Sequence, residues 1–214
     1  MFPSASNLLY TPLVESIRLD PEGPVNLDYH QARFDRSRGN FYPDAPPVDL
    51  RDLLEGLPLP PGNGRYKVRI VYDRDIREVT YRSYSIRCLE RIWMVEDDSI
   101  DYRYKYLDRS SLEELKRSAV PPEKADAEDI LIIKNGLVTD TTFSNVALFD
   151  GHGWVTPESC LLPGTRRSEL IESGRVRAVQ VRAEDIGKYR KISFINAMLD
   201  LGELCLSSDS ARVF

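Results

Sequence analysis

Histidine and cysteine, on which many enzyme classes depend, are both scarce in this sequence. Only His30 and His152 occur among 214 residues, so a Ser-His-Asp or Cys-His catalytic set has almost no candidates. The three cysteines, Cys88, Cys160 and Cys205, are widely spaced and form no CxxC pair, so neither a disulfide framework nor a zinc site is indicated. The HExxH and DxDxDG metal motifs are also absent. The residues therefore disfavour hydrolase triads and metal enzymes.

Neither sign of charge is concentrated in the chain. The 29 basic and 34 acidic residues give a net charge of -5, and a pI near 5.2 argues against a nucleic-acid partner. No stretch is long and apolar enough to span a bilayer. Residues 1–13 lack the basic and apolar regions of a secretory signal. We therefore expect a cytoplasmic protein that binds neither nucleic acid nor membrane.

The pattern of apolar residues predicts an α+β protein with two halves. In the first half, a strand at 13–19 and two short helices at 29–38 and 48–56 precede three strands, which we expect to form an antiparallel meander at 66–73, 77–86 and 88–96. In the second half, a helix capped by Ser110 or Ser111 precedes a hairpin around Asn135-Gly136 and another around Asp150–Gly153. A helix after Gly164, a short helix at 184–190 and a buried strand at 191–199 follow. We place an N-terminal subdomain at 1–100 and a C-terminal one at 101–214.

Four segments carry polar residues that such elements do not explain: 29–37, 104–109, 138–145, and 156–167 with 194–197. Taken in order, from about Val14 to about Leu201, they resemble the class IV aminotransferases, the fold-type IV pyridoxal-phosphate enzymes. That family includes branched-chain and D-amino-acid aminotransferases and aminodeoxychorismate lyase, and the lyase-like group is the most similar. The resemblance implies pyridoxal 5'-phosphate as cofactor, two subdomains with the cofactor cleft between them as in D-amino-acid aminotransferase, a homodimer, and a small amino-acid-like substrate.

The resemblance also assigns the central residue of the chemistry. A pyridoxal enzyme needs an amine that holds the aldehyde and later moves a proton of the substrate. Lys105 is followed by Asp108-Arg109 at the family's spacing and matches its Schiff-base lysine and general base, which places this function in the C-terminal subdomain. Without the other motifs, Lys105 would read as an exposed lysine at a strand end.

The pyridine nitrogen needs an anionic partner. Asp140 stands where the family has a Glu after a Val-Thr strand. Because Asp is one methylene shorter, the ring would sit closer or water would bridge the two groups; taken alone, Asp140 could instead organise a turn. Ser144 and Asn145 match the family's Ser-Asn pair, in which we interpret Asn145 as mainly structural.

The phosphate needs cations and free backbone N–H groups. Arg33 matches the phosphate arginine of the family's His-x-x-Arg segment and can bond two oxygens in a fork. Gly164-Thr165-Arg166 resembles the family's Gly-Ile-Thr-Arg turn, with Thr165 at its aliphatic position and Arg166 at its Thr. The sequence leaves open which hydroxyl faces the phosphate. In either alignment we expect the backbone N–H groups of this turn to bind it. Cations at a helix start oppose the dipole, which indicates an anion nearby.

The remaining assignments surround the ring and the substrate. Leu162 falls where the family has an aliphatic residue against the ring face, or is plain core. Asn196 and Ala197 fall where the last strand turns toward the phosphate and the substrate carboxylate. Ser16 lies on a strand that borders the substrate side. Thirteen residues precede Val14, too few for the family's N-terminal hairpin, so we expect one pocket wall to be missing or supplied by a partner subunit.

For function, the resemblance favours a lyase that forms 4-aminobenzoate and pyruvate, as in folate biosynthesis. An amino-acid aminotransferase of the branched-chain or D-amino-acid type is the alternative, because both reactions begin with proton removal by Lys105. A non-catalytic family member that binds pyridoxal phosphate is the third possibility. Dependence on a keto-acid acceptor separates the first two.

Overall fold

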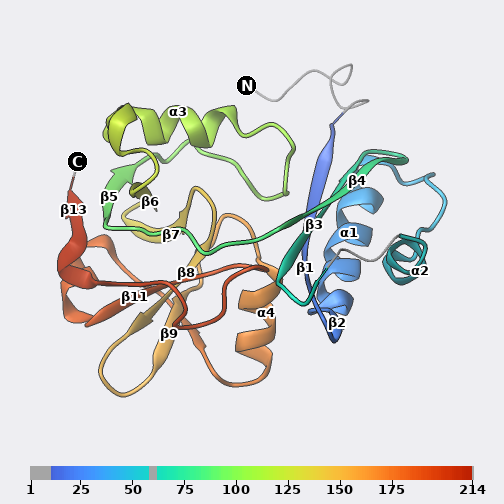
Figure 1. Cartoon of the computed structure of the whole chain (residues 1–214). Coiled ribbons are helices and arrows are strands. Elements are labelled where there is room, and N and C mark those ends of the chain that lie inside the picture. The colour runs from blue at the N-terminus through green and yellow to red at the C-terminus, as the bar shows by residue number, and fades with distance from the viewer. Residues whose placement is uncertain (1–10, 58–61, 214) are drawn as a thin grey trace. The chain divides into compact units, whose positions relative to one another are not determined.

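A computed structural model describes residues 11–57 and 62–213 (Figure 1). The described chain divides into two compact units. Unit 1 comprises residues 11–57, 62–85 and 104–108, and unit 2 comprises 86–103 and 109–213. Each unit contains a sheet with packed helices, which confirms the α+β class with two parts. The expectation that residues 1–13 form no secretory signal concerns a segment of which the structure describes only residues 11–13.

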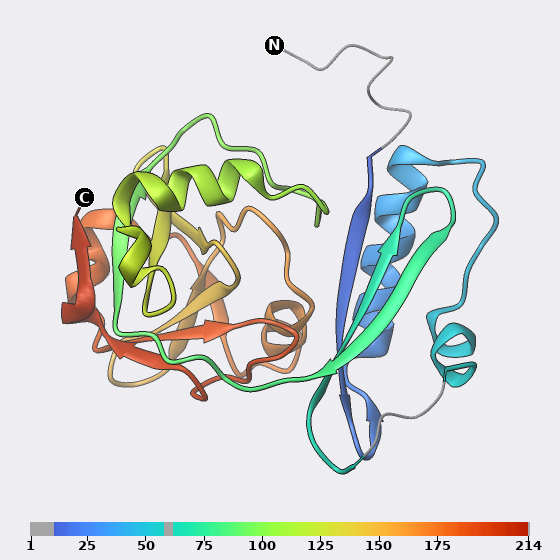
Figure 2. The same ribbon diagram turned by 45° about the horizontal axis from the view of Figure 1, so that its top comes forward.

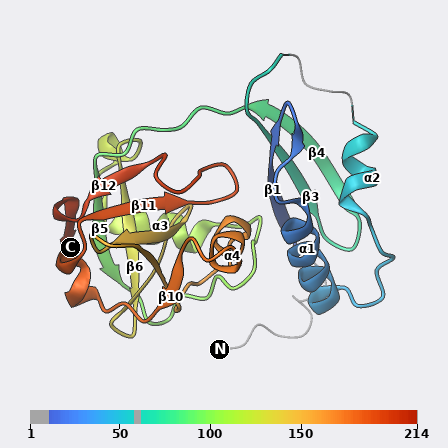
Figure 3. The same ribbon diagram turned by 90° about the horizontal axis from the view of Figure 1, so that it is seen from below.

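Unit 1 is an antiparallel sheet covered on one face by two helices (Figures 2 and 3). Its strand order is β2-β1-β3-β4, and the bounds are β1 Leu13–Asp20, β2 Gly23–Pro24, β3 Tyr66–Tyr72 and β4 Ile76–Ser83. Alternate residues of β1 and β3, such as Leu13, Ile17 and Ile70, are fully buried. They meet Phe34 of α1 (Leu27–Phe41) and Leu50 of α2 (Leu50–Glu55) in one core. The predicted strand and helices of this region are confirmed.

Unit 2 is built on a nine-stranded sheet of order β10-β9-β8-β7-β6-β5-β13, with β11 pairing with β8 and β12. The strands are β5 Arg91–Glu96, β6 Glu128–Lys134, β7 Leu137–Thr141, β8 Asn145–Phe149, β9 Trp154–Pro157, β10 Arg177–Val179, β11 Lys191–Ile195, β12 Cys205–Ser207 and β13 Ala211–Val213. The α-helices are α3 Ser110–Ala119 and α4 Thr165–Glu172, and the 3-10 helices are η1 Pro122–Lys124, η2 Ala183–Lys188 and η3 Ser208–Ser210. No helix within 11–57 and 62–213 is long and apolar enough to cross a membrane.

Two expectations about local structure need correction. Strand β5 does not continue the meander of β3 and β4; it lies parallel to β6 in the other unit. Parallel strands need a long crossover, and α3, which packs on β5 and β6, provides it. The N-cap of α3 is Arg109, without a side-chain cap bond, and not Ser110 or Ser111.

The structural unit that contains Lys105 also differs from the expectation. Residues 104–108 belong to unit 1 and not to the C-terminal half. The reason lies in the backbone: Val14 N–H donates to the Lys105 carbonyl (2.9 Å) and Leu107 N–H to the Pro12 carbonyl (2.9 Å). This segment therefore runs along β1.

Both predicted hairpins are present in unit 2. Asn135 (φ 52°) and Gly136 (φ 71°) both adopt the left-handed conformation that a two-residue turn between β6 and β7 requires. Between β8 and β9, the Asp150 carboxylate accepts from the N–H groups of His152 (2.8 Å) and Gly153 (2.9 Å). These turns set the pairing of β6 with β7 and of β8 with β9.

Candidate active site

Unit 1 buries three polar side chains as one hydrogen-bonded group. Glu15 of β1 accepts from Arg33 Nε (2.8 Å) and Nη2 (2.6 Å), and its Oε2 lies 2.7 Å from His30 Nδ1. His30 and Arg33 are three residues apart on α1 and therefore share the helix face that meets the sheet. Glu15 and His30 are fully buried. Hydrogen-bonded polar side chains thus occupy positions at the centre of this unit that apolar side chains fill in most protein cores.

The charges of this group determine its protonation. Burial by itself would raise the pKa of Glu15, but the neighbouring Arg33 and His30 lower it to about 2. Burial lowers the pKa of His30, with the charges of Arg33 and Lys105 acting in the same direction and Glu15 opposing them. Because Glu15 is ionised, neutral His30 carries its proton on Nδ1 and donates it to the carboxylate.

Arg33, the predicted phosphate ligand, is held by Glu15 along one edge of its guanidinium. The assignment of Arg33 stays a prediction, with Glu15 as the residue that orients it.

Lys105, the predicted Schiff-base lysine, is half-buried and anchored on both sides. Its neighbours Tyr104 and Tyr106 pack their rings against Phe41 at the end of α1, with centroid separations of 4.8 and 6.2 Å. The lysine is close enough to His30 for its charge to act on that ring. Ser16, the predicted substrate-side residue, is half-buried on the opposite face of β1 from Glu15.

Unit 2 brings four of the predicted residues into one network. Asp140 and Asn145 face each other as the only paired residues of β7 and β8. Asp140 accepts from Asn145 Nδ2 (2.7 Å) and from the Leu162 N–H (2.9 Å). Asn145 also donates to the Leu162 carbonyl (2.9 Å) and accepts from the Gly164 N–H (3.2 Å). Asn145 therefore fastens the loop before α4 to the strand that carries Asp140.

Gly164 must be a glycine in this arrangement. A Cβ placed there would lie 2.1 Å from Asn145 Oδ1, well inside van der Waals contact. The loop can approach the Asn145 amide only because no side chain intervenes.

Asp140 is a buried carboxylate whose hydrogen bonds come from neutral groups. Burial raises its pKa to about 6, while the Leu162 N–H, the Asn145 amide and the charge of Arg167 act in the other direction. Within 11–57 and 62–213, no cationic group donates a hydrogen bond to it. A cation placed against this carboxylate would favour its ionised form. The site therefore has the chemistry of a counter-ion for a protonated ring nitrogen.

The start of α4 combines backbone donors with a buried arginine pair. Thr165 begins the helix and is buried, after the N-cap Gly164. Arg166 forms ion pairs with Glu169 (3.1 Å) and Asp200 (2.6 Å). Glu169 and Asp200 thus balance the positive charge that Arg166 places at the helix start. The Arg166 side chain therefore needs no phosphate as a counter-ion. Its predicted phosphate contact then depends on its backbone N–H.

The remaining predicted residues lie on and beside the turn between β7 and β8. Thr141 Oγ1 accepts from the Ser144 N–H (3.0 Å) and lies 2.8 Å from Ser144 Oγ. Asn196 follows β11 and donates from Nδ2 to the Phe143 carbonyl (3.1 Å). Ala197 is its half-buried neighbour. The structure thus joins Ser144 and Asn196 through one turn.

Glu15 and its contact with His30 were not predicted from the sequence. One signal was present: Glu15 occupies a position of β1 whose neighbours in the alternation, Leu13 and Ile17, face the core. A charge on the apolar face of a strand indicates a buried partner. Arg87 and Asp129, for which no short motif exists, were not predicted either.

The chain is similar to proteins of one family over nearly its whole length. The family model described as amino-transferase class IV matches residues 12–203. An uncharacterised protein of Haemophilus influenzae is 32% identical over 189 residues, covering 87% of this chain and 97% of that protein.

Solved structures agree with this match. A protein of Haemophilus somnus 129PT, described as a candidate 4-amino-4-deoxychorismate lyase, is 32% identical with a TM-score of 0.81, covering 89% of this chain and 98% of that one. The PLP-bound form of a hypothetical aminotransferase from Mycobacterium tuberculosis shares the fold at 16% identity, with a TM-score of 0.68 and coverage of 94% and 81%.

We predict that Glu15→Gln destabilises the protein by about 3–5 kcal/mol at neutral pH, because it leaves Arg33 buried without its counter-charge. The folded pKa of Glu15, about 2, lies below its ordinary value of 4.5. The stabilisation by this carboxylate is therefore present above pH 4.5 and lost as the pH falls toward 2. Urea unfolding at several pH values should show the gap between the two proteins narrowing below pH 4.5. A gap that stays constant over that range would contradict the assignment.

We predict that Gly164→Ala costs about 1–3 kcal/mol of stability, because the new methyl group displaces Asn145 from the loop. Gly153→Ala is the matched control, since a Cβ there meets nothing within 4 Å. Thermal unfolding of both variants measures the difference. Equal melting temperatures for the two variants would show that the close approach at Asn145 does not constrain the loop.

Proposed function

The chain belongs to the class IV aminotransferase family, and we propose that within this family it is a lyase resembling 4-amino-4-deoxychorismate lyase. The observation that carries the proposal is the likeness to the Haemophilus somnus protein so described, at 32% identity over 98% of that chain. The aminotransferase neighbours of Mesorhizobium loti and Mycobacterium tuberculosis are 21% and 16% identical, and they support the fold alone.

Pyridoxal phosphate is the cofactor of this family, and when bound it withdraws electrons from the substrate carbon that loses its proton. The residues of this chain fit that group. Asp140 offers a buried carboxylate that receives hydrogen bonds only from neutral donors among the described residues, so it can pair with a cationic ring nitrogen. The start of α4, at Thr165 and Arg166, offers backbone donors of the kind that phosphates bind.

Lys105 has the central role in the proposed mechanism. Its amine would hold the cofactor aldehyde, and in its free form it would take the proton from the amine-bearing carbon of the substrate. The packing of Tyr104 and Tyr106 against Phe41 fixes the backbone on both sides of the lysine. The side chain therefore moves while its attachment point stays in place.

The other groups bind and orient. Asp140 retains its negative charge beside the ring nitrogen, and Asn145 holds Leu162 where its side chain can cover the ring face. Thr165 and Arg166 contribute backbone N–H groups to the phosphate, and Arg33, oriented by Glu15, contributes its guanidinium. Ser144, Asn196 and Ala197 line the cofactor, and Ser16 lies toward the substrate.

In the lyase reaction, removal of the ring proton is followed by loss of the enolpyruvyl group as pyruvate. The ring left behind is aromatic 4-aminobenzoate, whose stability favours this direction. The proposal includes a cytoplasmic homodimer in the folate pathway, with a partner subunit completing the substrate side. An aminotransferase with the same residues is the second candidate, because the family contains both reactions.

We predict that the protein loaded with pyridoxal phosphate converts 4-amino-4-deoxychorismate into equal amounts of 4-aminobenzoate and pyruvate without any keto acid. Lys105→Ala should lower the rate by a factor of about 10²–10⁴, because the proton-transfer group is removed. Lys191→Ala, at an exposed position of β11, is the control. Product that appears only after addition of a keto acid would favour the aminotransferase. A protein that binds the cofactor but converts no substrate would favour the hypothesis of a non-catalytic family member.

We predict that cofactor affinity falls as the pH drops from 7 to 5, because Asp140, with a pKa of about 6, loses the charge that attracts the ring nitrogen. Asp140→Asn carries no such charge, so its affinity should vary less over this range. Absorption titrations with pyridoxal phosphate measure both proteins, and the variant corrects for titration of the phosphate itself. The same pH dependence in both proteins would remove Asp140 from this role.

A further inference from the structure

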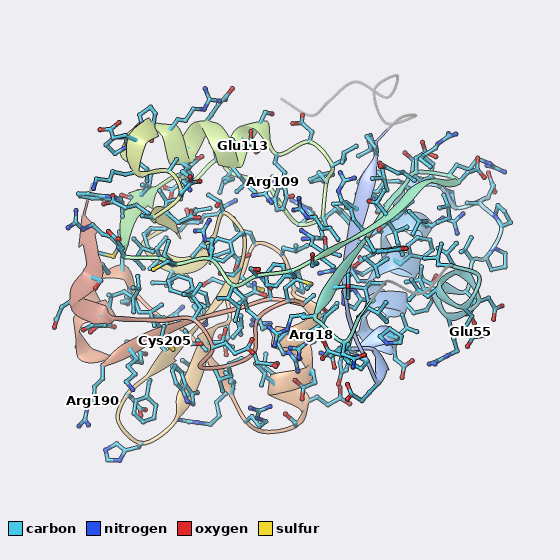
Figure 4. All side chains as sticks on the ribbon, in the orientation of Figure 1. Arg18, Glu55, Arg109, Glu113, Arg190 and Cys205 are labelled. Carbon is cyan, nitrogen blue, oxygen red and sulfur yellow. The ribbon has the colours of Figure 1, made fainter. Side chains whose placement is uncertain are left out.

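The turn that follows Asp140 is held from outside by three side chains of unit 2. The Thr142 hydroxyl lies 2.9 Å from each carboxylate oxygen of Asp129. The Thr142 carbonyl accepts from Arg109 Nη2 (2.8 Å), which projects from the residue before α3 (Figure 4). The Phe143 carbonyl accepts from Asn196.

Arg87 covers this turn with a fixed guanidinium. Its central carbon lies 3.9 Å from the centroid of the Phe143 ring. Its Nη2 donates to Asp129 Oδ2 at 2.7 Å. The two contacts fix both the plane and the position of the group, while 33% of the Arg87 side chain stays exposed. A guanidinium that is fixed and still accessible is prepared to bind an anion.

The charges around the turn do not balance. Asp129 is fully buried, and it pairs with Arg87 at 2.7 Å and with Lys116 at 3.6 Å. Arg109 contributes a third positive charge through its bond to Thr142. Three cations thus stand against two carboxylates, Asp129 and, directly before the turn, Asp140. In addition, the Nε of Arg87 is buried and has no hydrogen-bond partner within the part of the chain that the structure describes. This excess of positive charge favours an anionic ligand.

We propose that Arg87 binds a carboxylate of the substrate that lies away from the reacting amine, so that the enzyme prefers amines with a second carboxylate. The inference rests on the proposed function, in which Asp140 binds the cofactor ring, because the turn carrying Phe143 begins directly after Asp140. A carboxylate matches the planar fork of a guanidinium better than a single-point acceptor does. Asp129 and Phe143 are positioning residues for Arg87.

A second arginine of the same unit provides a matched comparison. Arg91 lies 5.5 Å from the Trp93 ring and 3.5 Å from Glu128, the residue before Asp129 on β6. Adjacent residues of a strand point to opposite faces, so Arg91 reproduces the chemistry of Arg87 on the other side of the sheet. Substitution at Arg91 therefore removes a stacked, ion-paired arginine without touching the turn after Asp140.

The test compares two unreactive probes on the enzyme loaded with pyridoxal phosphate: benzene-1,3-dicarboxylate and benzoate. Isothermal titration calorimetry should give a dissociation constant for the dicarboxylate that is roughly 10- to 100-fold lower, as a charge-assisted bond predicts. Arg87→Gln should abolish this preference, and Arg87→Lys should retain part of it. Phe143→Leu, which keeps the charge but removes the stacking surface, should reduce the preference. Arg91→Gln should leave it intact.

Because neither probe reacts, the result does not depend on the lyase assignment. Failure of the lyase would appear as absent turnover with the preference retained, whereas failure of this inference would appear in binding alone. Equal affinity of the wild-type protein for both probes would overturn the inference. So would an Arg87→Gln variant that keeps the preference or weakens both probes alike.

Discussion

The burial of Asp140 is the constraint on which the candidate site depends. Its carboxylate lies between β7 and β8 and is bonded only to neutral donors among the described residues, which leaves its pKa near 6. Those donors come from Asn145 and from the loop before α4, so the same bonds that solvate the carboxylate also shape that loop. The requirement for glycine at Gly164 follows from this arrangement.

The buried carboxylates of the two units have different partners, and their pKa values shift in opposite directions. Glu15 in unit 1 has a formal cation, Arg33, at hydrogen-bond distance, and its pKa falls to about 2. Asp140 in unit 2 has no such bonded partner within the described ranges, and its pKa rises to about 6. The first pair is complete and serves to hold α1 against β1. The second lacks such a bonded cation, and in the proposed function the ring nitrogen of the cofactor supplies it.

The sequence was informative where a short pattern determines local geometry or chemistry. The Asn135-Gly136 turn was predictable because few other residues tolerate two successive left-handed conformations. The segments ending at Asn145 and Gly164 were predictable from the family pattern, and the structure joins them through hydrogen bonds. The chemical roles of these residues stay predictions.

Other features depended on contacts between distant segments. Alternation indicates a strand but not its partner, so the parallel pairing of β5 with β6 could not be read from residues 88–96. Lys105 joins β1 through backbone bonds, which leave no trace in side-chain identity. The cation of Arg166 indicated an anion, but Asp200, one of the two carboxylates that meet it, is far along the chain.

The most direct test of the central claim is to reduce the protein with borohydride in the presence of pyridoxal phosphate and to map the label by mass spectrometry of its peptides. The account predicts one pyridoxyl group, attached to Lys105 and formed at cofactor concentrations close to that of the protein. A label spread over several exposed lysines, or found at a single different lysine, would contradict it.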